Sequence, residues 1–190
     1  RNNPFQGGGM NSLDGIIISH VNHMARHSWA FDRALELFAG NRLLKGGVII
    51  AIVWWVWFKK DEPRLKEREH IIVTFVGCII GMLVSRFLSM MLPFRLRPIH
   101  DESSGFILPY GVSPTALDGW SSFPSDHAVL FFALSAGLLF ISRKVGVIAL
   151  AYTTLFIAFP RIYLGMHYPT DIIAGAVIGI IIALLMNRYL

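Results

Sequence analysis

Three short polar motifs, each at the edge of a long apolar run, hold the residues of this chain that could do chemistry. They are Arg97-Pro98, then Phe123-Pro124-Ser125-Asp126-His127, then Arg161 followed by His167 and Asp171. Arginines can hold a phosphate, and histidines can attack it or protonate a leaving oxygen. If the apolar runs cross a membrane, their alternation puts all three motifs on one face. The set predicts a site that cleaves phosphate through histidine.

The third motif predicts a nucleophile. His167 precedes Tyr168-Pro169, and because a residue before proline avoids helical geometry, we expect the next helix to begin at Pro169. Asp171 then lies in its first turn, close enough to bond one ring nitrogen of His167 and leave the other free to attack. Arg161, at the end of the preceding helix, can offer its planar fork to phosphate oxygens. Taken singly, each residue is also typical of a helix end anchored at the headgroups.

The second motif predicts a helix start. Ser125 suits an N-cap, and the free N–H groups of the first turn bind anions. His127 then projects from the same turn, able to protonate a leaving oxygen. The charge of Asp126 favours the helix dipole but repels phosphate, so we expect it to point aside or to hold a neighbouring cation. A plain capped helix with an incidental histidine is the alternative.

Composition places the chain in a membrane. Of its 190 residues, 54% are hydrophobic and only 15% are charged. Several runs approach about 18 residues almost without charge, the length of a membrane span. A soluble domain of this size could not bury that much apolar surface. The net charge of +5 suits anionic lipid or phosphate, whereas nucleic acid is set aside because the basic residues form no stripe.

We expect an all-α fold: an integral membrane bundle of about five spans, plus an N-terminal amphipathic helix over residues 11–40 at the bilayer surface. The spans are predicted over residues 43–58, 70–92, 125–141, 145–165 and 169–189, with a kink at Pro160. Arg42 and Lys45 would extend the short first span by snorkelling to the interface. Gly77-x3-Gly81 and Gly175-x3-Gly179 have the spacing that lets membrane helices approach closely.

Residues 10–190 are expected to form a single domain, since no linker divides them. Residues 1–9, which contain Gly7-Gly8-Gly9 and no initiator methionine, look like an expression remnant or a disordered leader. The single Cys78 leaves no intrachain disulfide.

Lysine and arginine counts in the short connections predict the orientation. Basic turns follow the first and third spans, so the connections that carry the motifs are expected on the extracytoplasmic side of the cytoplasmic membrane. The basic residues of the N-terminal segment favour the opposite orientation. The cytoplasmic set is Lys59, Lys60, Arg64, Lys66, Arg68, Arg143, Lys144 and Arg188, and the opposing set is Arg26, Arg33, Arg42 and Lys45.

The motifs resemble those of the type 2 phosphatidic acid phosphatase (PAP2) superfamily of membrane phosphatases. Its pattern is Lys-x6-Arg-Pro, then Pro-Ser-Gly-His, then Ser-Arg-x5-His-x3-Asp. The third motif matches from Arg161 to Asp171, the second at Pro124-Ser125 and His127, and the first at Arg97-Pro98.

The resemblance implies a role for each matching residue. His167 would be the nucleophile that forms a phosphohistidine, oriented by Asp171, and His127 would be the acid for the leaving group. The phosphate would be held by Arg97, Ser125 and Arg161. No metal or other cofactor is implied.

The chain departs from the family pattern at three positions. Met90 stands where the lysine belongs, and Arg86 or Arg95 could supply the missing contact. Pro160 replaces the serine of the third motif. Asp126 replaces glycine, and the resulting Ser-Phe-Pro-Ser-Asp-His string resembles the bacterial undecaprenyl-diphosphate phosphatase branch.

The expected activity is hydrolysis of a lipid phosphate or diphosphate, with undecaprenyl diphosphate favoured over phosphatidylglycerophosphate or phosphatidic acid. Vanadate haloperoxidases share the residue set, but they are soluble and the spans argue against them. A non-catalytic membrane scaffold or lipid-binding protein is the remaining class. The expected partners are the lipid substrate and membrane lipids, and the sequence leaves the oligomeric state open.

His20, His23 and His27 recur at the spacing of one helical face, which raises the possibility of a metal site. No carboxylate or cysteine pattern accompanies them. We expect an interfacial helix face and no metal.

Overall fold

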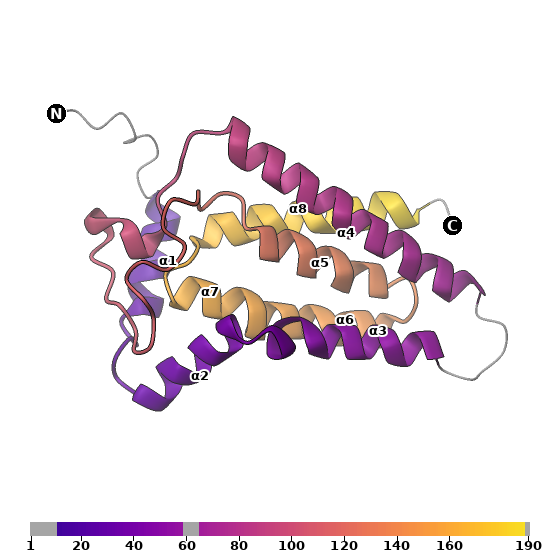
Figure 1. Cartoon of the computed structure of the whole chain (residues 1–190), viewed down its shortest axis with the longest axis horizontal. Helices are drawn as coiled ribbons and strands as arrows, with labels where there is room; N and C mark the ends of the chain where they lie inside the picture. The colour runs from indigo at the N-terminus through magenta and orange to yellow at the C-terminus, as the bar shows by residue number, and fades with distance from the viewer. Residues whose placement is uncertain (1–10, 59–64, 189–190) are drawn as a thin grey trace.

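A computed structural model describes residues 11–58 and 65–188 of the chain. These residues form helices and loops, with no β-strand among them. The predictions for residues 1–9 and for Lys59, Lys60 and Arg64 lie outside the described ranges. Figure 1 shows the long helices side by side, with the long loop before α5 gathered beside α1 at one end.

A short helix occupies the centre of the bundle. This is α5 (Asp126–Leu138), most of whose 13 residues are buried. It packs against α4 (Leu65–Met91), α8 (Pro169–Asn187) and α6 (Arg143–Tyr152). At about 1.5 Å per residue, α5 is about 20 Å long, which is less than the apolar thickness of a bilayer. It is therefore a core helix enclosed by longer ones.

Glycines bring α8 against the backbone of α5. A Cβ atom at Gly179 would lie 2.3 Å from the carbonyl oxygen of Val129, and one at Gly175 would lie 2.7 Å from that of Ser125. Neither position has room for a side chain, so the close approach predicted from Gly175-x3-Gly179 is confirmed. Because Gly175 touches Ser125, the starts of α5 and α8 lie together, and the Ser125 amide donates to the Asp171 carbonyl over 3.3 Å.

The helix changes type just before Pro160, and the kink expected at that residue stays a prediction. Arg143–Tyr163 consists of α6, a π-helical segment η4 (Thr153–Ala158) and α7 (Phe159–Tyr163). Proline has no N–H to donate and its ring clashes with the preceding turn, which favours such irregularity.

The predicted number of five spans is not confirmed. By length and composition, three helices in the described residues could cross a membrane: α4, Arg143–Tyr163 and α8. A fourth is possible if α2 (Trp29–Gly40) and the segment Leu43–Phe58, which meet at 71°, form one broken span. That segment comprises a π-helical turn η1 (Leu43–Gly47) and α3 (Val48–Phe58). The remaining apolar helix is the short α5.

The prediction of one amphipathic helix before residue 43 was wrong, because α1 (Ser12–Asn22) and α2 are separate helices with buried polar residues. The Asn22 side chain exchanges two hydrogen bonds of 2.7 Å with the backbone of Ile107. Asp32 accepts from the Tyr110 amide over 2.8 Å and from the Tyr163 hydroxyl. These side chains hold the long loop instead of facing water.

The three N-terminal histidines do not share a helical face. Helix α1 ends at Asn22, so His27 lies in the following turn, where its ring stacks on that of His23 at 5.4 Å. His20, His23 and His27 are all exposed.

Candidate active site

All three motifs meet at the end of the bundle where the long loop lies (Figure 1). Arg97 precedes a 3₁₀ turn, η2 (Pro98–His100), in that loop, and His127 lies in the first turn of α5. His167 lies in the turn between α7 and α8. Both predicted helix starts are confirmed, since α8 begins at Pro169 and the Ser125 hydroxyl accepts from the Ala128 amide.

The turn after α7 folds back over Arg161. The Arg161 carbonyl accepts from the amides of Met166, at 2.9 Å, and His167, at 3.2 Å. Gly165 has a φ of +70°, and a Cβ atom there would lie 2.6 Å from the ring of Phe106. Glycine is therefore required at this position. The tight turn places His167 beside the arginine that precedes it in the motif.

The geometry around His167 assigns its tautomer. The side chain is only 4% exposed. Its Nδ1 lies 2.8 Å from the Ser122 carbonyl oxygen, and its Nε2 lies 3.3 Å from a terminal nitrogen of Arg97. Because a carbonyl can only accept, the proton is on Nδ1 and Nε2 carries a lone pair. Nε2 is therefore the atom that can act as a nucleophile.

The surroundings of His167 keep the imidazole neutral. Burial is the largest cause, and the positive charges of Arg97 and Arg161 add to it, so the pKa of His167 lies well below its ordinary value. The bond from Nδ1 to Ser122 acts in the opposite direction but is outweighed. A neutral imidazole is the form that attacks phosphorus.

Asp171 does not bond to His167, contrary to the sequence prediction. The nearest carboxylate oxygen lies 3.9 Å from Nδ1. That oxygen instead accepts from the Ser122 hydroxyl, at 2.5 Å, and from the Tyr168 amide, at 2.8 Å. An aspartate in the first turn of a helix caps that helix readily, and this competes with a contact to the histidine. Asp171 thus fixes Ser122, whose own carbonyl orients the imidazole.

Arg97 is buried and joins two segments of the site. Its guanidinium donates to the carbonyl oxygens of Trp120, at 3.1 Å, and Ser121, at 3.0 Å, and also to that of Met166. It therefore links the end of the long loop to the turn that carries His167.

Arg161 is held far less tightly than Arg97. It is 3% exposed, and its Nε has no hydrogen-bond partner among the described residues. One of its terminal nitrogens lies 3.9 Å from the Met166 sulfur, which is a weak acceptor. A buried guanidinium whose donors are unmatched is costly unless an anion satisfies it. Arg161 is therefore the residue of this site that a bound phosphate would stabilise most.

Asp126 has a structural partner. Its carboxylate accepts from the Ser85 hydroxyl of α4 at 2.5 Å, so it ties the start of α5 to α4. A carboxylate has no proton to offer phosphate oxygens. It interacts electrostatically with Arg97 and Arg161, so its effect on an anion would pass through them.

The two candidates for the missing lysine differ. Arg86 is exposed, and its guanidinium carbon lies 4.4 Å from the centroid of the Trp120 ring. The backbone carbonyl of Trp120 also accepts a hydrogen bond from Arg97. Arg95 is committed elsewhere, because it donates to Asp14 at 2.6 Å and to Asp171. Arg95 is thus unsuited to hold phosphate.

Asp14 is a residue that sequence reasoning missed. It is fully buried, and besides Arg95 it binds the Thr170 amide at 3.0 Å and the Thr170 hydroxyl at 2.6 Å. Helix α1 is thereby attached to the first turn of α8. A lone aspartate early in a polar segment gave no signal of this role.

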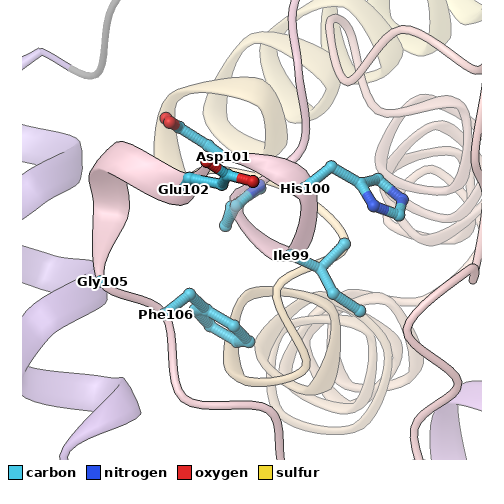
Figure 2. Close-up of a pocket in the computed structure, with 7 residues that line it drawn as sticks. Ile99, His100, Asp101, Glu102, Gly105 and Phe106 are labelled. Carbon is cyan, nitrogen blue, oxygen red and sulfur yellow. The ribbon is translucent and has the colours of Figure 1, made fainter.

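A pocket of about 500 Å³ lies in the long loop, and its lining does not include Arg97, Arg161 or His167. Figure 2 shows its lining, which includes His100, Asp101 and Glu102. Asp101 also accepts from the Tyr168 hydroxyl at 2.8 Å. With two carboxylates in its lining, this pocket is unsuited to a phosphate, and the anion site is better placed at Arg97 and Arg161.

Among residues 11–58 and 65–188, no three His, Cys, Asp or Glu side chains gather as a metal-binding group. The side chains that converge at this end of the bundle carry imidazole and guanidinium groups, and their chemistry is nucleophilic attack, proton transfer and anion binding.

Comparison with known proteins identifies relatives over most of the chain. The PAP2 superfamily model matches residues 70–190. Undecaprenyl-diphosphatase BcrC of Bacillus subtilis is 25% identical, with 91% of this chain and 82% of the relative covered. Lipid A 1-diphosphate synthase of Escherichia coli is 28% identical, with 90% and 73% covered. A crystal structure of a PAP2-type phosphatidylglycerolphosphate phosphatase from Bacillus subtilis superposes with a TM-score of 0.60 at 20% identity, covering 97% of this chain and 88% of the other.

Proposed function

Because the chain belongs to the PAP2 superfamily of membrane phosphatases, we propose that it removes the terminal phosphate of undecaprenyl diphosphate through a phosphohistidine. The similarity to BcrC, named as an undecaprenyl-diphosphatase, supports this substrate. One observation carries the mechanism. His167 Nε2 bears a lone pair beside the Arg97 guanidinium, and a second buried guanidinium, that of Arg161, has an Nε without a hydrogen-bond partner among the described residues.

The reaction follows from those positions. His167 Nε2 attacks the terminal phosphorus, and the bond from phosphorus to the bridging oxygen breaks. The electron pair goes to that oxygen, which takes a proton from the imidazolium form of His127, a form that the negative charge of the bound substrate would favour. Water then attacks the phosphohistidine, His127 takes its proton, and phosphate leaves while His167 is restored.

The other predicted residues would hold the substrate. Arg97 and Arg161 would neutralise the charge on the transferring group, and the Ser125 hydroxyl would lie beside it at the start of α5. Arg86, stacked on Trp120, would draw the headgroup toward the site. The proposed location is the extracytoplasmic face of the cytoplasmic membrane, which follows from the basic turns at the opposite end.

The test is phosphate release by the purified protein in detergent with a metal chelator present. A panel would compare undecaprenyl diphosphate with undecaprenyl phosphate, phosphatidylglycerophosphate and phosphatidic acid. We expect the highest kcat/KM on undecaprenyl diphosphate, no turnover in His167→Ala, and normal turnover in a control, His20→Ala, at an exposed histidine. Preference for a glycerophospholipid would refute the substrate alone, whereas full activity of His167→Ala would refute the mechanism.

A second candidate substrate is a lipid A phosphate group. It is favoured by the 38% identity to a lipid A 4'-phosphatase of Bacteroides thetaiotaomicron over 45% of this chain. Adding lipid A to the same panel separates the two substrates, because their phosphates are attached to different lipids.

A further inference from the structure

We propose that Lys45 binds the lipid-linked phosphate of a diphosphate substrate and thereby selects diphosphates over monophosphates. This inference rests on the proposed function and assigns a residue outside the three motifs. It places a cation from the N-terminal part of the chain beside the leaving group.

Lys45 lies in the π-helical turn η1, at the break between α2 and α3, and it is half-buried. The turn is held against the bundle on the side of α5 that carries His127. The Leu44 carbonyl accepts from the Tyr152 hydroxyl, and a Cβ atom added to Gly46 would lie 3.7 Å from the ring of Phe131. Phe131 lies one helical turn after His127, and the two rings are 6.3 Å apart.

The charges around Lys45 are those expected of an anion site. Lys45 is close enough to Arg161 and His127 to interact with both electrostatically. It makes no ion pair with a carboxylate in the described part of the chain. Two cations that repel each other are stabilised by a bound anion.

The position of Lys45 relative to the two histidines identifies which phosphate it would meet. Lys45 is next to Gly46, which packs on the ring of Phe131, and that ring lies 6.3 Å from the ring of His127. His127 is the proposed proton donor to the leaving oxygen. Lys45 therefore lies on the side of the leaving group, away from the nucleophile.

A cation beside the leaving group would favour the cleavage of lipid diphosphates over that of lipid monophosphates. When a lipid diphosphate is cleaved at its terminal phosphorus, the leaving group is a lipid monophosphate, which carries negative charge beside His127. When a lipid monophosphate is cleaved, the leaving group is an alcohol. An ammonium at this place stabilises the first transition state far more than the second.

The first motif agrees with this assignment. Met90, at the position of the family lysine, is 68% exposed and carries no charge, and Arg95 is bound to Asp14 and Asp171. Lys45 would supply a cation from a different helix. It would lie on the opposite side of the transferred phosphorus from His167.

The test compares undecaprenyl diphosphate with undecaprenyl phosphate, so that the lipid tail is constant. In Lys45→Gln, which keeps a polar side chain of similar length, we expect kcat/KM for the diphosphate to fall about tenfold or more and that for the monophosphate to fall less than about threefold. Lys45→Arg should restore much of the loss. The matched control is Lys144→Gln, the same change at an exposed lysine of α6, which should change neither value.

A binding measurement gives a readout independent of turnover. Pyrophosphate and orthophosphate are titrated into each purified variant in a calorimeter, and Lys45→Gln should weaken the binding of pyrophosphate more than that of orthophosphate. Equal losses on both substrates, or no loss, in a variant with unchanged Tm would overturn the role of Lys45. Wild-type protein that releases phosphate only from monophosphates would also overturn it, and wild-type protein that releases phosphate from no lipid would refute the proposed function instead.

Discussion

The two buried arginines of the site differ in what else they hold. Arg97 donates to three backbone carbonyls, so it supports the loop as well as any phosphate. Arg161 makes a weak contact to sulfur and leaves Nε unmatched among the described residues. Removing Arg97 should therefore affect both catalysis and folding, and removing Arg161 should affect catalysis alone.

We predict that Arg97→Ala and Arg161→Ala each slow kcat by about 10²-fold or more, since each removes a charged donor to the transition state. Thermal unfolding in detergent should separate them. Tm should fall in Arg97→Ala, whereas in Arg161→Ala it should stay level or rise, because a buried unpaired charge is lost. Arg143→Ala, at the far end of the bundle, is the control. Near-normal rates in both variants would place the phosphate elsewhere.

His167 gives a prediction for pH. Its pKa is lowered by burial and by Arg97 and Arg161, so the neutral, nucleophilic form persists below about pH 6.5, the ordinary histidine value. ¹⁵N NMR of labelled protein without substrate should show a neutral imidazole, protonated on Nδ1, at about pH 6. In Arg97→Gln the pKa should rise, since one positive charge is gone. Titration of the wild-type ring at or above the ordinary value would contradict this account.

At the scale of elements, the N-terminal helix is part of the support of the site. Helix α1 reaches α8 through Asp14, which binds Arg95 and Thr170. Arg95 in turn binds Asp171, and Asp171 holds Ser122, whose carbonyl orients His167. Four consecutive contacts thus connect a helix outside the motifs to the nucleophile.

We predict that Asp14→Ala lowers the stability of the protein by about 3–5 kcal/mol, because it leaves Arg95 without one of its two carboxylates in a buried setting. The measurement is Tm and denaturant unfolding in detergent, with Asp118→Ala, at an exposed aspartate of the long loop, as the control. Activity of the folded fraction should fall too, since a shift of about 1 Å at His167 can cost about 10²-fold. A Tm equal to that of the control would show that α1 is dispensable.

The helix starts could be predicted from the sequence, whereas the N-terminal region could not. Pro169 and Ser125 determine helix starts by local sterics and capping, which do not depend on distant residues. Asp14, Asn22 and Asp32 lie in the segment that was predicted to be one surface helix, yet each is buried against a segment far along the chain. Polarity alone does not tell an exposed side chain from one that holds a loop.

The contact between Asp171 and His167 was wrongly predicted for a related reason. Helical spacing brings the two residues near each other, but the competing partners Ser122 and Tyr168 are closer. Spacing predicts proximity along one segment, and only the packing of a second segment decides which bond forms.

At the scale of the whole molecule, the alternation of helices brings the three motifs to one end of the bundle, as Figure 1 shows. The start of α6, which holds Arg143 and Lys144, and the end of α8 lie toward the opposite end (Figure 1). This separation supports the proposed orientation, with the site outside and the basic turns in the cytoplasm. The basic N-terminal residues lie at the site end and favour the reverse, so the orientation needs a direct test.

The orientation can be tested by labelling introduced cysteines. The single native cysteine, Cys78, is 4% exposed and should give little background labelling. We predict that Ser113→Cys, in the exposed part of the long loop, reacts with a membrane-impermeant maleimide in intact cells. Lys144→Cys, at an exposed position in the first turn of α6, should react only after the membrane is permeabilised. The reverse pattern would place His167 in the cytoplasm, and it would mean that the basic residues of α2 and η1 outweigh those of the turns. In that case a substrate presented on the outer leaflet could not reach Arg97 and Arg161, and the proposed function would have to be assigned to the inner leaflet.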